Sequence, residues 1–184
     1  MANGDSMNLW LRLTLITMTV GGGFTGLAAT CHALQSSFNS HSQTPLNLLM
    51  MGVFLVLNAG VIASGLLFVC DPHRTNPLLA ALAVQIPWIS SYLIAYRFAT
   101  GFELVLSVNG PAKGEDLAFH LGWAFFLGTS WSLSFSQEHQ FGLGVNVWAL
   151  TMLVLLWRSV RTPLPVLQPA TSMPLEANSA PHPQ

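Results

Sequence analysis

One apolar run without a single charged residue, from Leu46 to Cys70, constrains this chain more than any other feature. A helix needs about 20 residues to cross a hydrocarbon core of about 30 Å, so this run is long enough to span. Charged residues make up 7% of the chain and hydrophobic residues 52%, whereas soluble domains carry about 25% charged residues. So few charges cannot cover a water-facing surface. The sequence therefore predicts an integral membrane protein.

Three further segments are also apolar. One begins at Leu9, one begins at Leu78 and contains Pro87, and the last runs from Leu143 to Trp157. Proline removes a backbone hydrogen bond and clashes with the preceding turn, so we expect Pro87 to kink its helix. The sequence predicts four spanning helices, at about 9–34, 46–70, 78–97 and 142–158.

The first segment also has some features of a signal peptide. Its start, MANGDSMN, carries Asp5 and neither Lys nor Arg, and GLAAT at 26–30 is a weak cleavage-like site. A cleavable signal needs a positively charged start and a short apolar core. We therefore expect this helix to be retained.

The region between the third and fourth segments has a different period. TSWSLSFS at 129–136 alternates large and small side chains, and LAFHLGWAFFLG at 117–128 does the same. Alternation of this kind, bounded by Gly, Asn, Pro and Asp, indicates strands. We predict an antiparallel β-meander at about 102–136, outside the hydrocarbon layer. The alternative is a fifth spanning helix from Leu117 to Phe135.

The positions of the basic residues favour the meander over a fifth helix. Cytoplasmic segments carry the excess of Lys and Arg. With four helices and the N-terminus inside, Arg12, Arg74, Arg158 and Arg161 are inner, and only Arg97 and Lys113 are outer. A fifth helix would place Arg158 and Arg161 on the opposite side of the membrane from Arg74. The predicted fold is an all-α membrane protein, a four-transmembrane-helix bundle with a small antiparallel β-meander inserted between helices three and four.

The last segment, 162–184, differs from the rest because it holds six prolines. It cannot build a core, so we expect a disordered, Pro-rich cytoplasmic tail. Both termini are then cytoplasmic, and the membrane is most simply a bacterial inner (plasma) membrane.

Small and polar residues inside the predicted helices are candidates for helix packing. Small residues four apart allow close backbone contact in lipid, where no hydrophobic force drives helices together. Such contacts join helices within one chain or form an oligomer face. Asn58 and Gln85 lie near the middle of predicted helices and are a candidate intramembrane polar pair. The helix-packing candidates are Gly22, Gly26, Gly60 and Ser64.

The third predicted helix ends in a group of aromatic and charged residues. Trp88, Tyr92 and Tyr96 are four apart, and Arg97 and Glu103 flank the start of the meander. The simpler interpretation is an aromatic belt at the membrane interface. The alternative is an ion pair, or a site where Arg97 holds an anionic head group.

Histidine and cysteine give no recognisable metal or redox motif. His32, His41, His120 and His139 would lie on the outer side with Glu115, Asp116 and Glu138, but no pair has a known ligand spacing. Cys31 and Cys70 fall at opposite ends of predicted spans, too far apart for a disulfide. We predict no catalytic residue, no metal site and no cofactor.

These features exclude some classes of function but do not identify a single one. A net charge of −1 gives no basic footprint for nucleic acid. Every charged side chain is placed near a helix end or in a loop, which argues against an ion-coupled transporter. We expect a non-catalytic structural, assembly or accessory subunit, whose partners are the bilayer and a membrane protein or further copies of itself. The alternatives are an oligomeric channel or transporter component, lined by Asn58, Gln85 and the threonines of the first helix, and a redox or metal-binding protein using the outer histidines.

Overall fold

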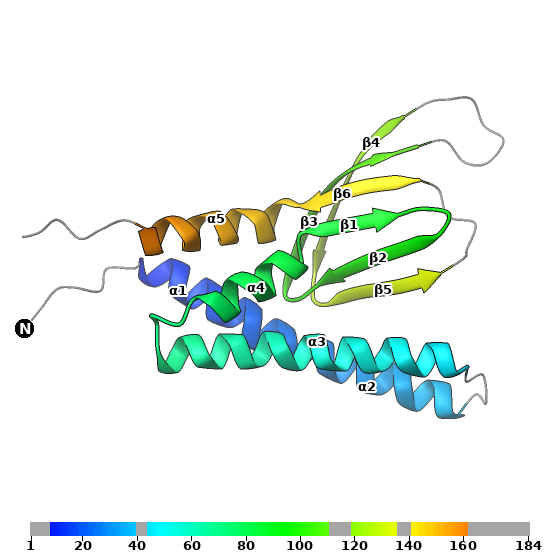
Figure 1. Cartoon of the computed structure of the whole chain (residues 1–184), viewed down its shortest axis with the longest axis horizontal. Coiled ribbons are helices and arrows are strands. Elements are labelled where there is room, and N and C mark those ends of the chain that lie inside the picture. The colour runs from blue at the N-terminus through cyan, green and yellow to red at the C-terminus, as the bar shows by residue number, and fades with distance from the viewer. Residues whose placement is uncertain (1–7, 40–43, 111–118, 136–140, 162–184) are drawn as a thin grey trace, which may run out of the picture.

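The computed structural model describes residues 8–39, 44–110, 119–135 and 141–161. It contains helices and a six-stranded antiparallel sheet (Figure 1). The helical elements are α1 Leu9–Ile16, η1 Thr17–Gly21, α2 Gly22–Asn39, α3 Pro45–Cys70, α4 Asn76–Val84 and α5 Val147–Arg161. The strands are β1 Pro87–Ser90, β2 Ile94–Ala99, β3 Phe102–Asn109, β4 His120–Leu127, β5 Ser130–Phe135 and β6 Gly142–Asn146.

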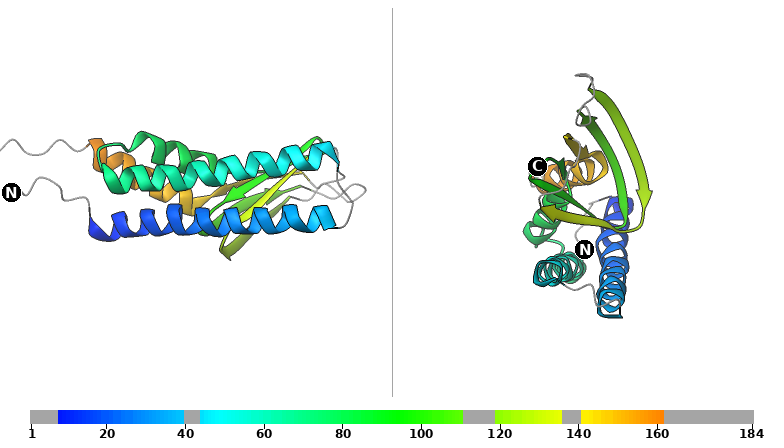
Figure 2. Two further views of the ribbon diagram at one scale, coloured as in Figure 1. Left: turned by 90° about the horizontal axis from the view of Figure 1, so that it is seen from below. Right: turned by 90° about the vertical axis from the view of Figure 1, so that its right-hand side faces the viewer.

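Two long apolar helices form one side of the molecule. The first is continuous from Leu9 to Asn39, with one π-helical turn at η1, and the second is α3. The two lie side by side along the long axis (Figure 2). The Thr44 hydroxyl caps α3 by accepting from the Asn47 amide at 3.2 Å, and Pro45 occupies the first turn, where its missing N–H is not needed.

The four-helix bundle predicted from the sequence is wrong, and the third and fourth predicted helices show why. The helix expected over 78–97 ends at Val84. Pro87 ends it rather than kinking it, because the residue before a proline avoids helical geometry. The chain continues as β1 and β2, so the sheet receives two strands from a segment predicted to span as a helix.

The helix expected over 142–158 is also partly a strand. Residues 142–146 form β6, and α5 begins only at Val147. A Cβ on Gly142 would lie 2.7 Å from the Trp88 ring, and one on Gly144 would lie 3.0 Å from it. The two glycines therefore let Trp88 of β1 lie against β6, a non-local contact that favours the strand.

The sheet is larger than the predicted meander and is placed differently. Its strand order is β4-β3-β6-β1-β2-β5, so the predicted meander supplies β3, β4 and β5 but the centre comes from elsewhere in the chain. Residues 120–127 and 130–135 are strands, not a fifth helix. The sheet lies beside α2 and α3 rather than beyond the end of the helices (Figure 1).

Two clusters of buried apolar residues join the elements. One lies among the helices at the end where the described chain begins and finishes, around Leu15, Phe68, Leu78, Leu82, Met152 and Leu156. The other joins α3 to the sheet through Phe54, Val61 and Phe98. The rings of Phe54 and Phe98 are 6.0 Å apart, and those of Phe54 and Trp131 are 4.7 Å apart. The predicted Pro-rich tail, 162–184, lies outside the described residues.

Candidate functional site: a buried ion pair and a two-faced sheet

The strand register separates the sheet into an apolar face and a polar face. Residues opposite one another on paired strands share a face, and alternate residues change face. The apolar face carries Leu121, Trp123, Phe125 and Leu127 of β4, Phe102, Leu104, Leu106 and Val108 of β3, Leu143 and Val145 of β6, and Tyr96, Phe98, Trp131 and Leu133 of β2 and β5. The polar face carries Glu103, Ser107, Gly122, Gly142, Gly144, Asn146, Arg97, Ser130, Ser132 and Ser134, and it also holds the apolar side chains of Trp88, Val105 and Phe126.

The helices cover only part of the apolar face. Phe54 of α3 packs on Phe98 and Trp131, and Trp148 of α5 packs on Phe102. The β4 side is left open: Leu121 is 89% exposed and Trp123 75% exposed. Isolated exposed apolar residues are ordinary, but a contiguous apolar surface marks contact with lipid or protein.

An ion pair lies at the end of the polar face where β2 turns into β3. Arg97 donates from Nε and Nη2 to both oxygens of Glu103, at 2.8 to 3.2 Å, and the Ser130 hydroxyl donates to the same carboxylate. The Glu103 side chain is 2% exposed and that of Arg97 33%. A buried carboxylate needs both charge and hydrogen-bond partners. Here it receives both.

The ion pair connects strands that are not neighbours. Arg97 belongs to β2, Glu103 to β3 and Ser130 to β5, whereas β6 and β1 lie between β3 and β2 in the sheet. The sheet is curved (Figure 2), which brings these strands together at one end. The bonds among these three side chains therefore hold β2, β3 and β5 together at the curved end of the sheet.

This end of the sheet is level with the middle of the long helices. A Cβ on Gly22, near the centre of Leu9–Asn39, would lie 2.5 Å from the Gly101 nitrogen. Glu103 is two residues beyond Gly101, or about 7 Å along an extended strand. The expectation that every charged side chain lies near a helix end or in a loop is thus wrong for Arg97 and Glu103.

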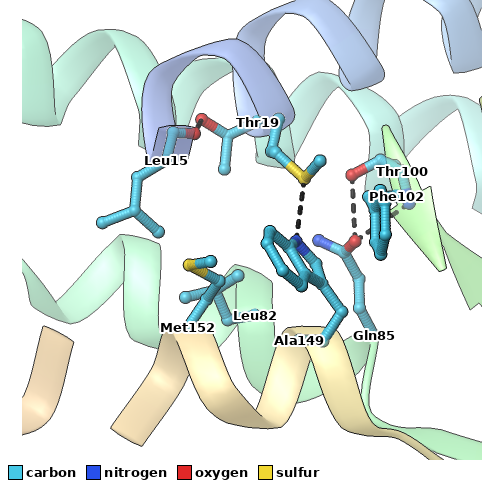
Figure 3. Close-up of a pocket in the computed structure, with 10 residues that line it drawn as sticks. Leu15, Thr19, Leu82, Gln85, Thr100, Phe102, Ala149 and Met152 are labelled. Atoms are coloured by element: carbon cyan, nitrogen blue, oxygen red, sulfur yellow. Dashed lines mark hydrogen bonds between the residues drawn. The ribbon is translucent and has the colours of Figure 1, made fainter. Parts of the chain in front are cut away.

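Gln85 also fastens this turn, from the end of α4. Its Oε1 accepts from the Thr100 amide at 2.9 Å and from the Thr100 hydroxyl at 3.0 Å, and its Nε2 donates to the Ala81 carbonyl. Beside it is a small cavity among α1, η1, α4, α5 and the turn, where the Trp148 Nε1 donates to the Met18 sulfur at 3.1 Å (Figure 3). The cavity has room for about one water molecule.

Asn58 does not pair with Gln85, and its side chain instead faces the first long helix. Its Nδ2 donates to the Phe54 carbonyl at 2.8 Å, and its Oδ1 has no hydrogen-bond partner among the described residues. A Cβ on Gly26 would lie 2.0 Å from that oxygen. Gly26 therefore leaves space for the Asn58 amide between α2 and α3.

The small residues predicted to pack helices have different surroundings. Gly22 contacts the β2–β3 turn and Gly26 contacts Asn58. Ser64 is buried, and its hydroxyl donates to the Val61 carbonyl at 2.8 Å. A Cβ on Gly60 would meet nothing within 4 Å. Three of the four thus serve packing within this chain, and Gly60 lies open.

The three aromatic residues predicted to share a helix face do not do so. Trp88 lies on β1, Tyr92 lies between β1 and β2 and is 52% exposed, and Tyr96 lies on β2. The Tyr96 hydroxyl donates to the Val84 carbonyl at 2.9 Å. Because their segment is extended, a four-residue spacing no longer places side chains on one stripe.

Histidines and cysteines are scattered over the described residues. His32 lies on α2 and His120 at the start of β4, and Cys31 and Cys70 are free and exposed. In the part of the chain that the structure describes, no group of three or more His, Cys, Asp or Glu could hold a metal ion. His41, His139, Glu115, Asp116 and Glu138 lie outside the described residues.

Two residues with clear roles were missed in the sequence. The alternation identifies Ser130 only as one of several serines on a strand, because its bond to Glu103 depends on the curvature of the sheet. Asn146 was detectable: its Oδ1 accepts from the Ala149 amide at 3.3 Å, as in an N-cap, and it precedes an apolar helix. The same oxygen accepts from the Leu104 amide and so joins α5 to β3.

No protein-family model, curated protein sequence or solved structure matches this chain.

Proposed function

We propose that this chain is a non-catalytic integral membrane protein, a structural, assembly or accessory subunit that acts through contacts with membrane-embedded partners. The observation that carries the proposal is the exposure of large apolar side chains along both a long helix and the sheet: Val56 of α3 is 72% exposed, and Leu121 of β4 is 89% exposed. In lipid such a surface is solvated; in water it would aggregate.

The long helices support this proposal by exposure as well as by length. Leu9–Asn39 and Pro45–Cys70 are long and apolar enough to span, a test that core helices and signal sequences also pass. In each, only 33% of the most apolar window is buried. A core helix of a soluble protein would be mostly buried, so lipid is the simplest environment for the rest.

The placement of charge supports an orientation. Arg12, Arg74 and Arg158 belong to the first turn of α1, the α3–α4 turn and the end of α5, which lie together at one end of the molecule (Figure 1). Cytoplasmic ends carry the excess of basic residues. We place this end, and with it both ends of the described chain, in the cytoplasm of a bacterial cell.

A charge placed at Val56 tests the membrane part of the proposal. On a soluble protein, Val56→Lys would be a neutral surface change, but near the centre of a span a lysine costs about 2.5–3.5 kcal/mol of insertion free energy. We expect Val56→Lys to deplete the protein from the carbonate-washed membrane fraction. Val160→Lys, at a position 54% exposed near the basic end of α5, is the matched control and should insert normally. Recovery of wild-type protein in solution without detergent would contradict the proposal.

A pull-down tests the accessory role. Purification of the tagged full chain in mild detergent should recover a stoichiometric membrane partner or a homo-oligomer. A monodisperse monomer without a partner would contradict that role and leave the membrane location standing.

A transport component is the second candidate, favoured by the ion pair. A charged pair at membrane depth is rare and often marks a substrate path. In the proposed membrane position, Arg97 of β2 and Glu103 of β3 form such a pair. Flux into liposomes that falls in Glu103→Gln, while the protein remains folded, would support it. Asn58 and Gln85, the residues first considered for a pore, are both buried.

A further inference from the structure

The sheet has two open edges. β4 pairs with β3 and β5 pairs with β2, and among the described residues no strand pairs with the outer side of either. Soluble proteins protect such edges with Lys, Pro or other charged residues, because an open edge is a template for another strand. From Phe119 to Phe135 the chain contains no Lys, Arg, Asp, Glu or Pro. Both edges are therefore competent to pair.

The two edges do not close on each other, although only Gly128 and Thr129 separate them. The Gly128 amide donates to the Gly101 carbonyl at 3.0 Å, and the Thr129 hydroxyl donates to the Gly22 carbonyl at 2.9 Å. The Thr129 and Thr25 hydroxyls are 3.0 Å apart. These bonds hold the link against α2 and the β2–β3 turn, and from it β4 and β5 diverge (Figure 1).

The directions of the two edge strands relative to the membrane normal determine which strand can pair with each edge. Five antiparallel ladders separate β4 from β5, so the two edge strands run in opposite directions. Copies of one protein share one orientation in a membrane, so their symmetry axis lies along the membrane normal. About such an axis β4 of one copy meets β5 of the next antiparallel. A contact of β4 with β4 would run parallel and leave β5 open.

We propose that the occupant of each edge is a second copy of this chain, with β4 of one copy paired antiparallel to β5 of its neighbour in a closed ring. The side chains suit this pairing. Trp123 and Phe125 would continue the apolar face next to Leu133, and the small Ala124 would lie next to Ser132 on the polar face. Both edges are then satisfied at once, as a strand in lipid requires. The inference rests on the proposed membrane location and adds the identity of the partner.

Cysteine cross-linking between differently tagged copies tests this pairing. In a background with Cys31→Ser and Cys70→Ser, one copy carries Ala124→Cys and the other Ser132→Cys, and oxidation is done in native membranes. We expect a cross-linked dimer carrying both tags, several-fold more abundant than from the control pair Val56→Cys and Ser132→Cys. Ala124→Lys, which places a charge on the edge, should convert the detergent-extracted oligomer to a monomer of unchanged thermal stability.

Each other outcome overturns the inference. A further variant carries Ala124→Cys and Ser132→Cys in one chain. A disulfide that forms only within this variant shows that the sheet closes on itself, and a dimer of Ala124→Cys with itself shows the β4–β4 contact. Another protein cross-linked at Ala124→Cys removes the second copy but leaves the proposed function intact. A monomer extracted from the membrane without a partner removes both the second copy and the accessory role, and leaves only the membrane location. Recovery of the chain in solution without detergent overturns both the inference and the proposed function.

Discussion

At the scale of single residues, Glu103 is the side chain whose surroundings matter most. Its carboxylate is 2% exposed and accepts from Arg97 and Ser130. Removing one partner of a buried pair is expensive because the other charge stays behind without compensation. Arg97 is one-third exposed, so solvent relieves part of that penalty.

We therefore expect Glu103→Gln to lower the free energy of unfolding by about 2 kcal/mol. Asp71→Asn is the matched control, because Asp71 pairs with Arg74 at 3.2 Å and both side chains are well exposed. Its effect should stay below about 1 kcal/mol. Chemical unfolding in detergent micelles measures both variants, and equal losses would show that the buried pair stabilises the fold no more than the exposed pair does.

Gly22 and Gly60 give a second contrast between residues. A Cβ at Gly22 would lie 2.5 Å from backbone of the β2–β3 turn, which cannot rotate away, and a Cβ at Gly60 would meet nothing within 4 Å. Gly22→Ala should destabilise the chain by about 1–3 kcal/mol through overpacking. Gly60→Ala should be neutral or stabilise the helix by up to about 1 kcal/mol. Melting temperatures in one detergent decide the order, and the reverse order would contradict the contact between Gly22 and Gly101.

At the scale of elements, local sequence patterns predict some of the helices and strands but not all of them. The uncharged run ending at Cys70 and the alternation before Phe135 could be interpreted from the sequence, because both are local periodicities. The segment from Pro87 to Arg97 could not, since it is apolar on both faces and its aromatic spacing fits a helix equally well. Its pairing with β6 depends on residues far along the chain.

The junction of β6 and α5 gives a prediction at this scale. Asn146 caps α5 and also accepts from β3, so Asn146→Ala should cost about 1–2 kcal/mol. Asn146→Ser retains a capping oxygen and should lose less. Hydrogen exchange should show faster exchange in the first turn of α5 in the alanine variant, and unchanged protection there would rule out the cap.

At the scale of the whole molecule, the chain from α4 to Thr100 runs to the far end of the long helices and then returns about halfway along them. α4 starts at the basic end, β1 carries the chain to the Tyr92 turn at the opposite end, and β2 returns it to Thr100, level with the middle of the helices (Figure 1). A four-span bundle would instead leave Thr100 in water on the outer side. The two arrangements differ in what a membrane-impermeant reagent can reach.

Single cysteines in a background lacking Cys31 and Cys70 separate these arrangements. We expect His73→Cys to react with an impermeant maleimide from the cytoplasmic side and Tyr92→Cys from the other side, because the two turns lie at opposite ends of the molecule. Thr100→Cys should react from neither side, because Thr100 is 2% exposed and bonded to Gln85. Denaturation in detergent should make all three reactive, which controls for expression. Labelling of Thr100→Cys from the side that reaches Tyr92→Cys would place the β2–β3 turn in water and contradict the proposed position of the ion pair within the membrane.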